Sequence, residues 1–288
     1  MSIDVLQEKI RKTKNPSVVV FEALPDLVPP ELLETASVQQ AVETLCMQLL
    51  AELKSYVPAV RFGFSSFALL GTDGLTCLSR LLQEAKNQGY YVLLDAPESL
   101  SVAAAQNSAA VLGAEDTPYP CDGLVGSAYL GSDIFKEYLP LCKQGKSFFP
   151  IVRTANKSAA ELQDLLTGGR LVHTAAADIV NRQGESMIGK FGYSQVGVVA
   201  AASSADSLRA LRAKYPKLFL LLDGYDYPNA NAKNCSFAFD KLGHGAAACA
   251  CASVIGAWKD PESGEYTAAA VEAVLRMRKN LTRYVSIL

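Results

Sequence analysis

The chain alternates eight short runs of mostly apolar residues with segments that repeat apolar residues every three or four positions. None of the runs has the every-second-residue polarity of a strand with one wet face, so each predicts a strand buried on both faces. The runs span residues 17–22, 57–64, 90–95, 121–127, 147–153, 195–201, 218–222 and 246–252. Eight strand–helix pairs of this kind predict an α/β protein, a closed parallel (β/α)8 TIM barrel.

Helical patterns precede the first strand and follow each strand. An amphipathic helix is expected over residues 1–12, and the helical region after the fifth strand is enlarged, with Gly168 and Gly169 dividing it into two pieces. The helices that follow the strands are expected over 29–53, 73–88, 103–112, 132–142, 159–166, 171–188, 205–214, 233–242 and 264–284. An open doubly wound sheet is the alternative, but no Gly-x-Gly-x-x-Gly turn follows any strand. No linker or repeat divides the chain, so residues 1–288 are expected to form one domain.

Composition argues against several partners. The chain has 27 Lys and Arg against 29 Asp and Glu, a net charge of −2, without a long run of one sign. Neither nucleic acid nor an anionic membrane is therefore expected as a partner. The longest apolar run, residues 246–257, is too short to span a bilayer, and the first residues lack an apolar signal core, so a cytoplasmic location is expected.

The cysteines and histidines do not predict a metal site. Seven cysteines, an odd and scattered number, fit reduced core thiols better than a disulfide framework. The spacing of Cys235, His244, Cys249 and Cys251 matches no standard zinc pattern, so no metal is expected. The other histidine, His173, has no visible Ser-His or Cys-His partner.

Acidic residues gather where strands end, the part of a barrel that carries chemistry. A ring of their oxygens at the mouth could bind a hard cation or a cationic small molecule, or the acids could pair with Arg61 and Arg153. Asp95, at the end of the third strand, could instead cap the following turn or helix. The acids of the ring are Glu22, Asp95, Asp223 and Asp226.

Short motifs along nearly the whole chain resemble those of one family, the orotidine 5′-phosphate decarboxylases in their longer bacterial form. The motifs are Lys14-Asn15-Pro16, residues 57–60 (VPAV), 129–133 (YLGSD), 153–156 (RTAN), 161–165 (ELQDL), 188–194 (IGKFGYS), Gly224-Tyr225 and 255–258 (IGAW). The resemblance implies a cofactor-free barrel that converts orotidine monophosphate to uridine monophosphate in de novo pyrimidine biosynthesis. It also implies a homodimer whose two active sites are shared between subunits.

The family's catalytic pattern is broken in this chain. The resemblance implies a lysine on the second strand and Asp-x-Lys-x-x-Asp at the end of the third, where the central lysine protonates the carbanion. The corresponding positions are Arg61, Asp95, Pro97 and Leu100, so only the first aspartate is kept. Proline supplies neither a positive charge nor a proton, and a guanidinium is a poor proton donor.

The positions that grip the substrate have also changed. The resemblance implies that Glu22 takes the place of an aspartate that holds the ribose. It also implies that Asp95, Thr154, Asn156 and Tyr225 are remnants of the substrate site. The resemblance further implies that Pro228 stands in a phosphate-binding loop, where it removes an N–H donor, and that Ala252 replaces an arginine that binds the phosphate.

Three hypotheses follow. The first is a decarboxylase-like protein that is catalytically impaired or a pseudoenzyme. The second is a non-catalytic dimer that binds another small ligand at the barrel mouth, a cation, or a genuine decarboxylase partner. The third is a different enzyme that uses Arg61, Asp95 and Glu22 on an unphosphorylated substrate.

Overall fold

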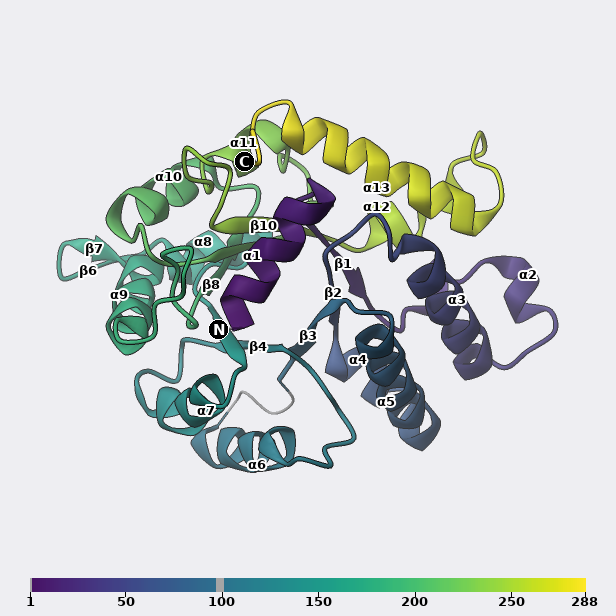
Figure 1. Ribbon diagram of the computed structural model, residues 1–288, viewed down its shortest axis with the longest axis horizontal. Helices are drawn as coiled ribbons and strands as arrows, with labels where there is room; N and C mark the ends of the chain where they lie inside the picture. Colours follow the sequence, from purple (N-terminus) through teal and green to yellow (C-terminus); the bar gives the residue numbers. More distant parts are fainter. Residues whose placement is uncertain (1, 97–100) are drawn as a thin grey trace.

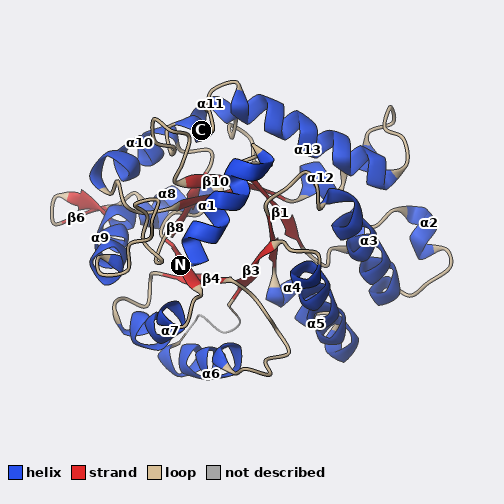
Figure 2. Cartoon of the chain, in the orientation of Figure 1, coloured by secondary structure: helices blue, strands red, loops and turns tan. Residues whose placement is uncertain are grey.

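Eight parallel strands close into a barrel within residues 2–96 and 101–288, the part of the chain that the computed structural model describes (Figures 1 and 2). The closed order is β1-β10-β9-β8-β5-β4-β3-β2, so neighbouring barrel strands are also consecutive along the chain. The predicted barrel is confirmed. Its strands are β1 (Ser17–Phe21), β2 (Ala59–Phe62), β3 (Tyr91–Asp95), β4 (Gly123–Ser127), β5 (Ser147–Ile151), β8 (Val198–Ala201), β9 (Leu220–Asp223) and β10 (Ala246–Ala250).

Helices surround the barrel on all sides in Figure 2. The longer ones are α1 (Ser2–Thr13), α3 (Val38–Leu53), α5 (Gly71–Asn87), α6 (Val102–Gly113), α7 (Asp133–Lys143), α9 (Val172–Gly184), α10 (Ala205–Lys214) and α13 (Tyr266–Thr282). The short ones are α2 (Pro30–Leu33), α4 (Phe64–Ala68), α8 (Ala160–Gln163), α11 (Ala232–Ser236) and α12 (Ala252–Ile255), with 3-10 turns at Pro25–Leu27, Lys157–Ala159 and Ala257–Lys259.

The helix expected over residues 29–53 is in fact two helices. Ser37 begins α3 with a capping box, in which its hydroxyl accepts from the Gln40 N–H and the Gln40 side chain accepts from the Ser37 N–H. Such reciprocal capping starts a new helix, so the chain turns between α2 and α3. The helix expected over 233–242 also ends early, since α11 stops at Ser236.

The region after β5 is only partly helical. A two-stranded antiparallel hairpin, β6 (Leu166–Thr167) and β7 (Arg170–Leu171), lies between α8 and α9, and it projects at the left of Figure 2. Gly168 and Gly169 both have positive φ, 56° and 79°. Two consecutive residues with positive φ form the tight turn that joins hairpin strands. Gly168 and Gly169 therefore form the turn between β6 and β7, in addition to separating two helices.

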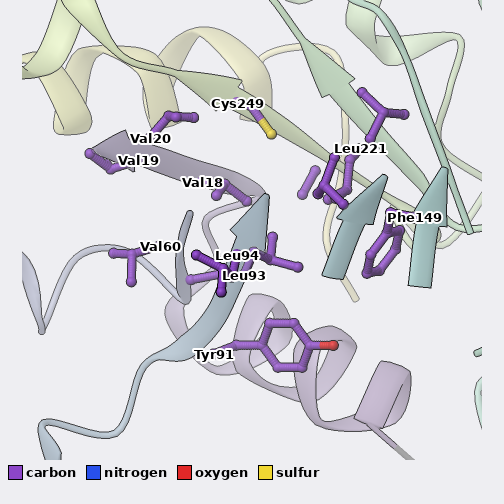
Figure 3. Packing of buried hydrophobic residues seen from close by; sticks show 14 of the residues in the cluster. Val18, Val19, Val20, Val60, Tyr91, Leu93, Leu94, Phe149, Leu221 and Cys249 are labelled. Carbon is purple, nitrogen blue, oxygen red and sulfur yellow. The ribbon is translucent and has the colours of Figure 1, made fainter. Parts of the chain in front are cut away.

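Large side chains fill the inside of the barrel, as Figure 3 shows for Tyr91, Leu93, Phe149 and Leu221. Gly197 makes room for this packing. A Cβ at position 197 would lie 2.6 Å from the Phe149 ring and 2.5 Å from the Phe219 carbonyl oxygen. A larger residue at position 197 would displace the Phe149 ring, so this position requires a glycine.

Helix α1 lies across one end of the barrel in Figure 1 and is hydrogen-bonded to it. The Ser2 hydroxyl lies 2.8 Å from the Tyr91 hydroxyl, and the Ile3 N–H donates to the buried Gln195 side chain. Gly245 donates its N–H to the Gln7 side chain. Because α1 closes the amino ends of the strands, the carboxyl ends form the open mouth.

Candidate functional site

Four of the charged residues singled out in the sequence lie together at the barrel mouth. Arg61 is on β2, Asp95 ends β3, Asp223 ends β9, and Glu22 follows directly after β1. In the sheet register, Arg61 lies beside Val20 of β1 and Leu93 of β3. The side chains of these four residues therefore come from both halves of the barrel and meet over its centre.

The guanidinium of Arg61 is the centre of this cluster. Its Nε donates to Asp95 Oδ1 at 2.5 Å and its Nη2 to Asp95 Oδ2 at 3.0 Å, a bidentate pair. Its Nη1 donates to Asp223 Oδ1 at 3.3 Å. Arg61 is 5% exposed, whereas the Asp95 and Asp223 side chains are 30% and 36% exposed. The cation is thus buried beneath two carboxylates that reach solvent.

The charge on Arg61 is fixed. Burial lowers the pKa of Arg61, but the nearby carboxylates of Asp95 and Asp223 raise it more, so the pKa lies well above its ordinary value. Arg61 therefore stays protonated and cannot act as a proton donor near neutral pH. The buried thiol of Cys249 on β10 also faces Arg61, and burial raises the pKa of that thiol to about 12. Cys249 is accordingly a neutral core residue and not a nucleophile.

Glu22 lies at the edge of the same cluster. Burial is the largest influence on the pKa of Glu22 and raises it. A hydrogen bond from Ser66 and the charge of Arg61 lower the pKa, whereas the charges of Asp95 and Asp223 raise it. The net effect is an increase. The carboxylate packs against Gly63, where an added Cβ would fall 2.2 Å from its oxygens. Gly63 thus leaves the space that Glu22 needs, and the site favours the neutral form of this acid more than water does.

Asp226 does not join the charged cluster. Its Oδ2 accepts from the backbone N–H of Cys251 at 2.6 Å and of Ala252 at 3.1 Å, and its Oδ1 accepts from that of Ser253 at 3.2 Å. Three successive N–H groups that converge on one anion form a nest, the arrangement that proteins use to bind phosphate. Here a carboxylate of the same chain occupies it.

A cavity of about 330 Å³ opens between the loops that follow β5, β8 and β9. It is lined by Arg153, Ala155, Asn156, Lys157, Ser203, Ser204, Tyr227, Pro228 and Asn229. Asn156 and Pro228, two of the sequence-predicted positions, therefore lie at the mouth. Glu22, Arg61 and Asp95 are not part of this lining, so the charged cluster and the cavity are separate features of the mouth.

Arg153 is held beside the cavity by one acid outside the predicted ring, Asp164. It makes a bidentate pair with Asp164, at 3.0 and 2.9 Å, and Nδ1 of the buried His173 lies 3.2 Å from the same carboxylate. The expected pairing of the ring carboxylates with arginine is therefore confirmed for Arg61, whereas Arg153 pairs with Asp164.

Two predicted substrate positions point elsewhere. The Thr154 hydroxyl and N–H both bond to the Gln163 side chain, which anchors the loop after β5. Tyr225 lines a different cavity, together with residues of α11 and α13. The structure does not bring these two side chains together with the residues of the mouth.

The remaining predictions for the mouth have mixed outcomes. Ser101 caps α6 by accepting from the Ala104 N–H, so the helix half of the expectation that Asp95 caps the following turn or helix is wrong, and Asp95 pairs with Arg61. The turn itself falls on residues 97–100, outside the described residues. Pro97 and Leu100 lie outside the described residues. Ala252 contributes its N–H to the Asp226 nest.

Residues 2–96 and 101–288 hold neither a cluster of metal ligands nor a membrane-spanning helix. These residues contain no group of three or more His, Cys, Asp and Glu side chains arranged to hold a metal ion. None of their helices is both long and apolar enough to cross a bilayer.

Sequence reasoning missed the bond from Asp226 to the turn after β10 and the contribution of Lys157 and Tyr227 to the cavity. Lys157 and Tyr227 each follow the end of a strand by a few residues, which is the available signal for a mouth position. The nest leaves no signal in the side chains, because backbone N–H groups make it.

No family model matches the chain. Among curated proteins, the orotidine 5′-phosphate decarboxylase of Rhodopirellula baltica is 28% identical over 215 residues, which cover 73% of this chain and 71% of that protein. The decarboxylase of Clostridium novyi is 24% identical over 98% of both chains. A solved structure of a candidate orotidine-monophosphate decarboxylase from Toxoplasma gondii superposes with a TM-score of 0.79 over 98% of both chains, at 20% identity. The two sequences support the relationship, and the solved structure shows that the fold is shared.

We expect Asp95→Asn to destabilise the protein by about 1–3 kcal/mol. The amide cannot accept two charge-assisted bonds, so the buried Arg61 would keep only Asp223. The loss should stay below the 3–5 kcal/mol of a fully buried pair because water reaches Asp95. Urea unfolding at pH 7 measures it. Glu8→Gln breaks the exposed pair with Lys190 and should change stability by less than about 0.5 kcal/mol. Equal effects of the two substitutions would contradict the central role of Arg61.

The raised pKa of Glu22 predicts a pH-dependent effect of Glu22→Gln. In the wild type, the folded state holds a proton that the unfolded state releases, so stability falls as pH rises from about 4.5 through the folded pKa. The glutamine variant lacks this loss. Its stability relative to wild type should therefore increase with pH and level off above the folded pKa.

Urea unfolding between pH 4.5 and 8 measures this difference, with the exposed Glu52→Gln as a control that should follow the wild type throughout. If the free energy of unfolding of Glu22→Gln, minus that of wild type, fell as pH rises, the pKa of Glu22 would be lowered by folding.

Proposed function

The chain belongs to the orotidine 5′-phosphate decarboxylase family, and we propose that it no longer converts orotidine monophosphate to uridine monophosphate but binds an unphosphorylated polar molecule at the barrel mouth. The observation that carries the proposal is the bond of Asp226 to the N–H groups of residues 251–253. These groups follow β10, where the family resemblance places the phosphate of the substrate.

Phosphate binding is opposed in two ways at this turn. A phosphate dianion would have to displace the Asp226 carboxylate, and the two negative groups would repel each other at contact distance. The arginine that would attract the phosphate is replaced by Ala252. Pro228, in the preceding loop, has no N–H to offer. A nucleotide would therefore lose the contacts that hold its phosphate in the family.

Proton transfer is opposed at the centre of the mouth. Loss of carbon dioxide leaves a carbanion, which needs a nearby cation that can also give up a proton. Pro97 occupies the position of the proton-donating lysine. Arg61 supplies charge, but Asp95 and Asp223 already use its donors and raise its pKa. We infer that the chain has no group for the protonation step.

The mouth suits a neutral ligand with several hydroxyl groups. The cavity lining offers two hydroxyls, Ser203 and Ser204, and two amides, Asn156 and Asn229, beside the ring of Tyr227. The exposed Lys157 and the Asp164-paired Arg153 also line the cavity, whereas Asp95 and Asp223 pair with Arg61 in the separate cluster. A volume of about 330 Å³ is at the lower end of the range for small-molecule pockets.

The direct test is an assay of uridine monophosphate formation from orotidine monophosphate with the purified chain. We expect no product above the uncatalysed background. An active decarboxylase added to the same protein solution serves as the control, because its undiminished rate would rule out an inhibitor in the preparation. Turnover at about 1 s⁻¹ or faster, the ordinary range for enzymes, would refute the proposal.

Asp226→Ala tests the occupied nest. Three backbone donors lose their acceptor, so we expect a loss of about 1 kcal/mol, as for removal of a helix cap. Inorganic phosphate, compared with chloride at equal ionic strength, should then raise the melting temperature of the variant more than that of the wild type. Asp116→Ala, at an exposed aspartate, should behave as wild type. Equal phosphate effects in Asp226→Ala and wild type would mean that Asp226 does not block an anion site.

A further inference from the structure

A second cavity, of about 530 Å³, lies between the loop after β9, helix α11 and the end of α13. Its lining shares no residue with the mouth cavity. The residues that give it chemical character are Tyr225, Asn231, Lys233, Asn280, Arg283 and Tyr284. This cavity goes beyond the proposed function, which concerns the mouth alone.

The charge of this cavity is positive. Lys233 and Arg283 are both exposed, and neither makes an ion pair within the described part of the chain. No aspartate or glutamate lines the cavity. Asp226, beside Tyr225 in the sequence, directs its carboxylate to the turn after β10. Two cations without a counterion attract an anion, even though the whole chain carries a net charge of −2.

The aromatic residues add flat, partly apolar surface. Tyr284 is 49% exposed, and Tyr225 is partly buried with its phenol facing the Asn280 amide. A tyrosine ring can stack on a planar ligand, while its hydroxyl and a neighbouring amide supply directional hydrogen bonds. The Asn231 side chain is occupied, since it caps α11 by accepting from the Asn234 N–H. The remaining recognition groups are the two cations and the Tyr284 phenol, while the Tyr225 phenol and the Asn280 amide bond to each other beside the Tyr225 ring.

We propose that this cavity binds a small planar organic anion, with its charged group paired to Lys233 and Arg283 and its ring against Tyr225 and Tyr284. The combination of charge and flat surface distinguishes such a ligand from inorganic phosphate, which has only charge. It also distinguishes the ligand from a neutral aromatic molecule, which has only the flat surface.

Isothermal titration of the full chain with three probes tests the proposal. Benzoate has both features, benzamide keeps the ring without the charge, and inorganic phosphate keeps charge without the ring. We expect benzoate to bind with a Kd of about 1 mM or tighter, and the other two probes to bind at least about tenfold more weakly, the cost of about 1.4 kcal/mol of lost interaction.

The double variant Lys233→Gln/Arg283→Gln should weaken benzoate binding at least about tenfold, while Lys54→Gln, at an exposed lysine outside this cavity, should leave it unchanged. If the double variant does not fold, the single variants and a salt titration replace it. Ion pairing predicts that wild-type affinity falls as sodium chloride is raised. Benzoate that binds no tighter than benzamide, or binding that is insensitive to the double variant or to salt, would overturn the proposal.

Discussion

A guanidinium buried inside a parallel barrel is tolerated only if its charge is matched, and Arg61 depends for this on Asp95 and Asp223. Asp95 ends β3, next to β2, whereas Asp223 ends β9, three strands away from β2 in the other direction around the barrel. The interaction therefore connects opposite parts of the mouth. Both carboxylates are paired with Arg61, so fewer of their oxygens are left to accept hydrogen bonds from a ligand.

The second constraint at the mouth is the bond from Asp226 to residues 251–253. It holds the loop after β9 against the turn after β10, and it places a carboxylate on the donors that could bind an external anion. The barrel beneath is closed and complete, so the substitutions on which the proposed loss of decarboxylation rests lie at or near strand ends and not in the scaffold. Such a separation is expected of a TIM barrel, whose loops determine chemistry while its strands determine stability.

The loop after β9 takes part in both proposed ligand sites. Tyr227, Pro228 and Asn229 line the mouth cavity, whereas Tyr225 and Asn231 line the cationic cavity beside α13. Asp226 stands between Tyr225 and Tyr227, and its bond fixes this part of the loop to the turn after β10. Neither lining contains a carboxylate: Lys157 and the Asp164-paired Arg153 line the mouth cavity, and Lys233 and Arg283 line the other.

Much of the fold follows from local patterns that the sequence shows directly. The eight buried strands were predictable because each is a short apolar run. Helix α10 has the predicted bounds of 205–214 because its apolar residues repeat at helical spacing up to the next strand. The β6–β7 hairpin was not predictable from periodicity, since each strand has only two residues. The break at Ser37 was missed because the apolar pattern continues across it, although Ser37 and Gln40 have the spacing of a capping box.

For the candidate site, the sequence by itself determined which side chains stand at the strand ends, and its family resemblance is the basis for the proposal that catalytic groups are missing. Only the tertiary structure decided how they pair. Arg61 lies 34 positions from Asp95 and 162 from Asp223 in the chain, and Asp226 bonds to N–H groups that carry no side-chain signal. Local periodicity depends on neighbours in the sequence, whereas closure of the barrel brings distant strand ends together, so the partners of Arg61 and Asp226 emerge only from the folded chain.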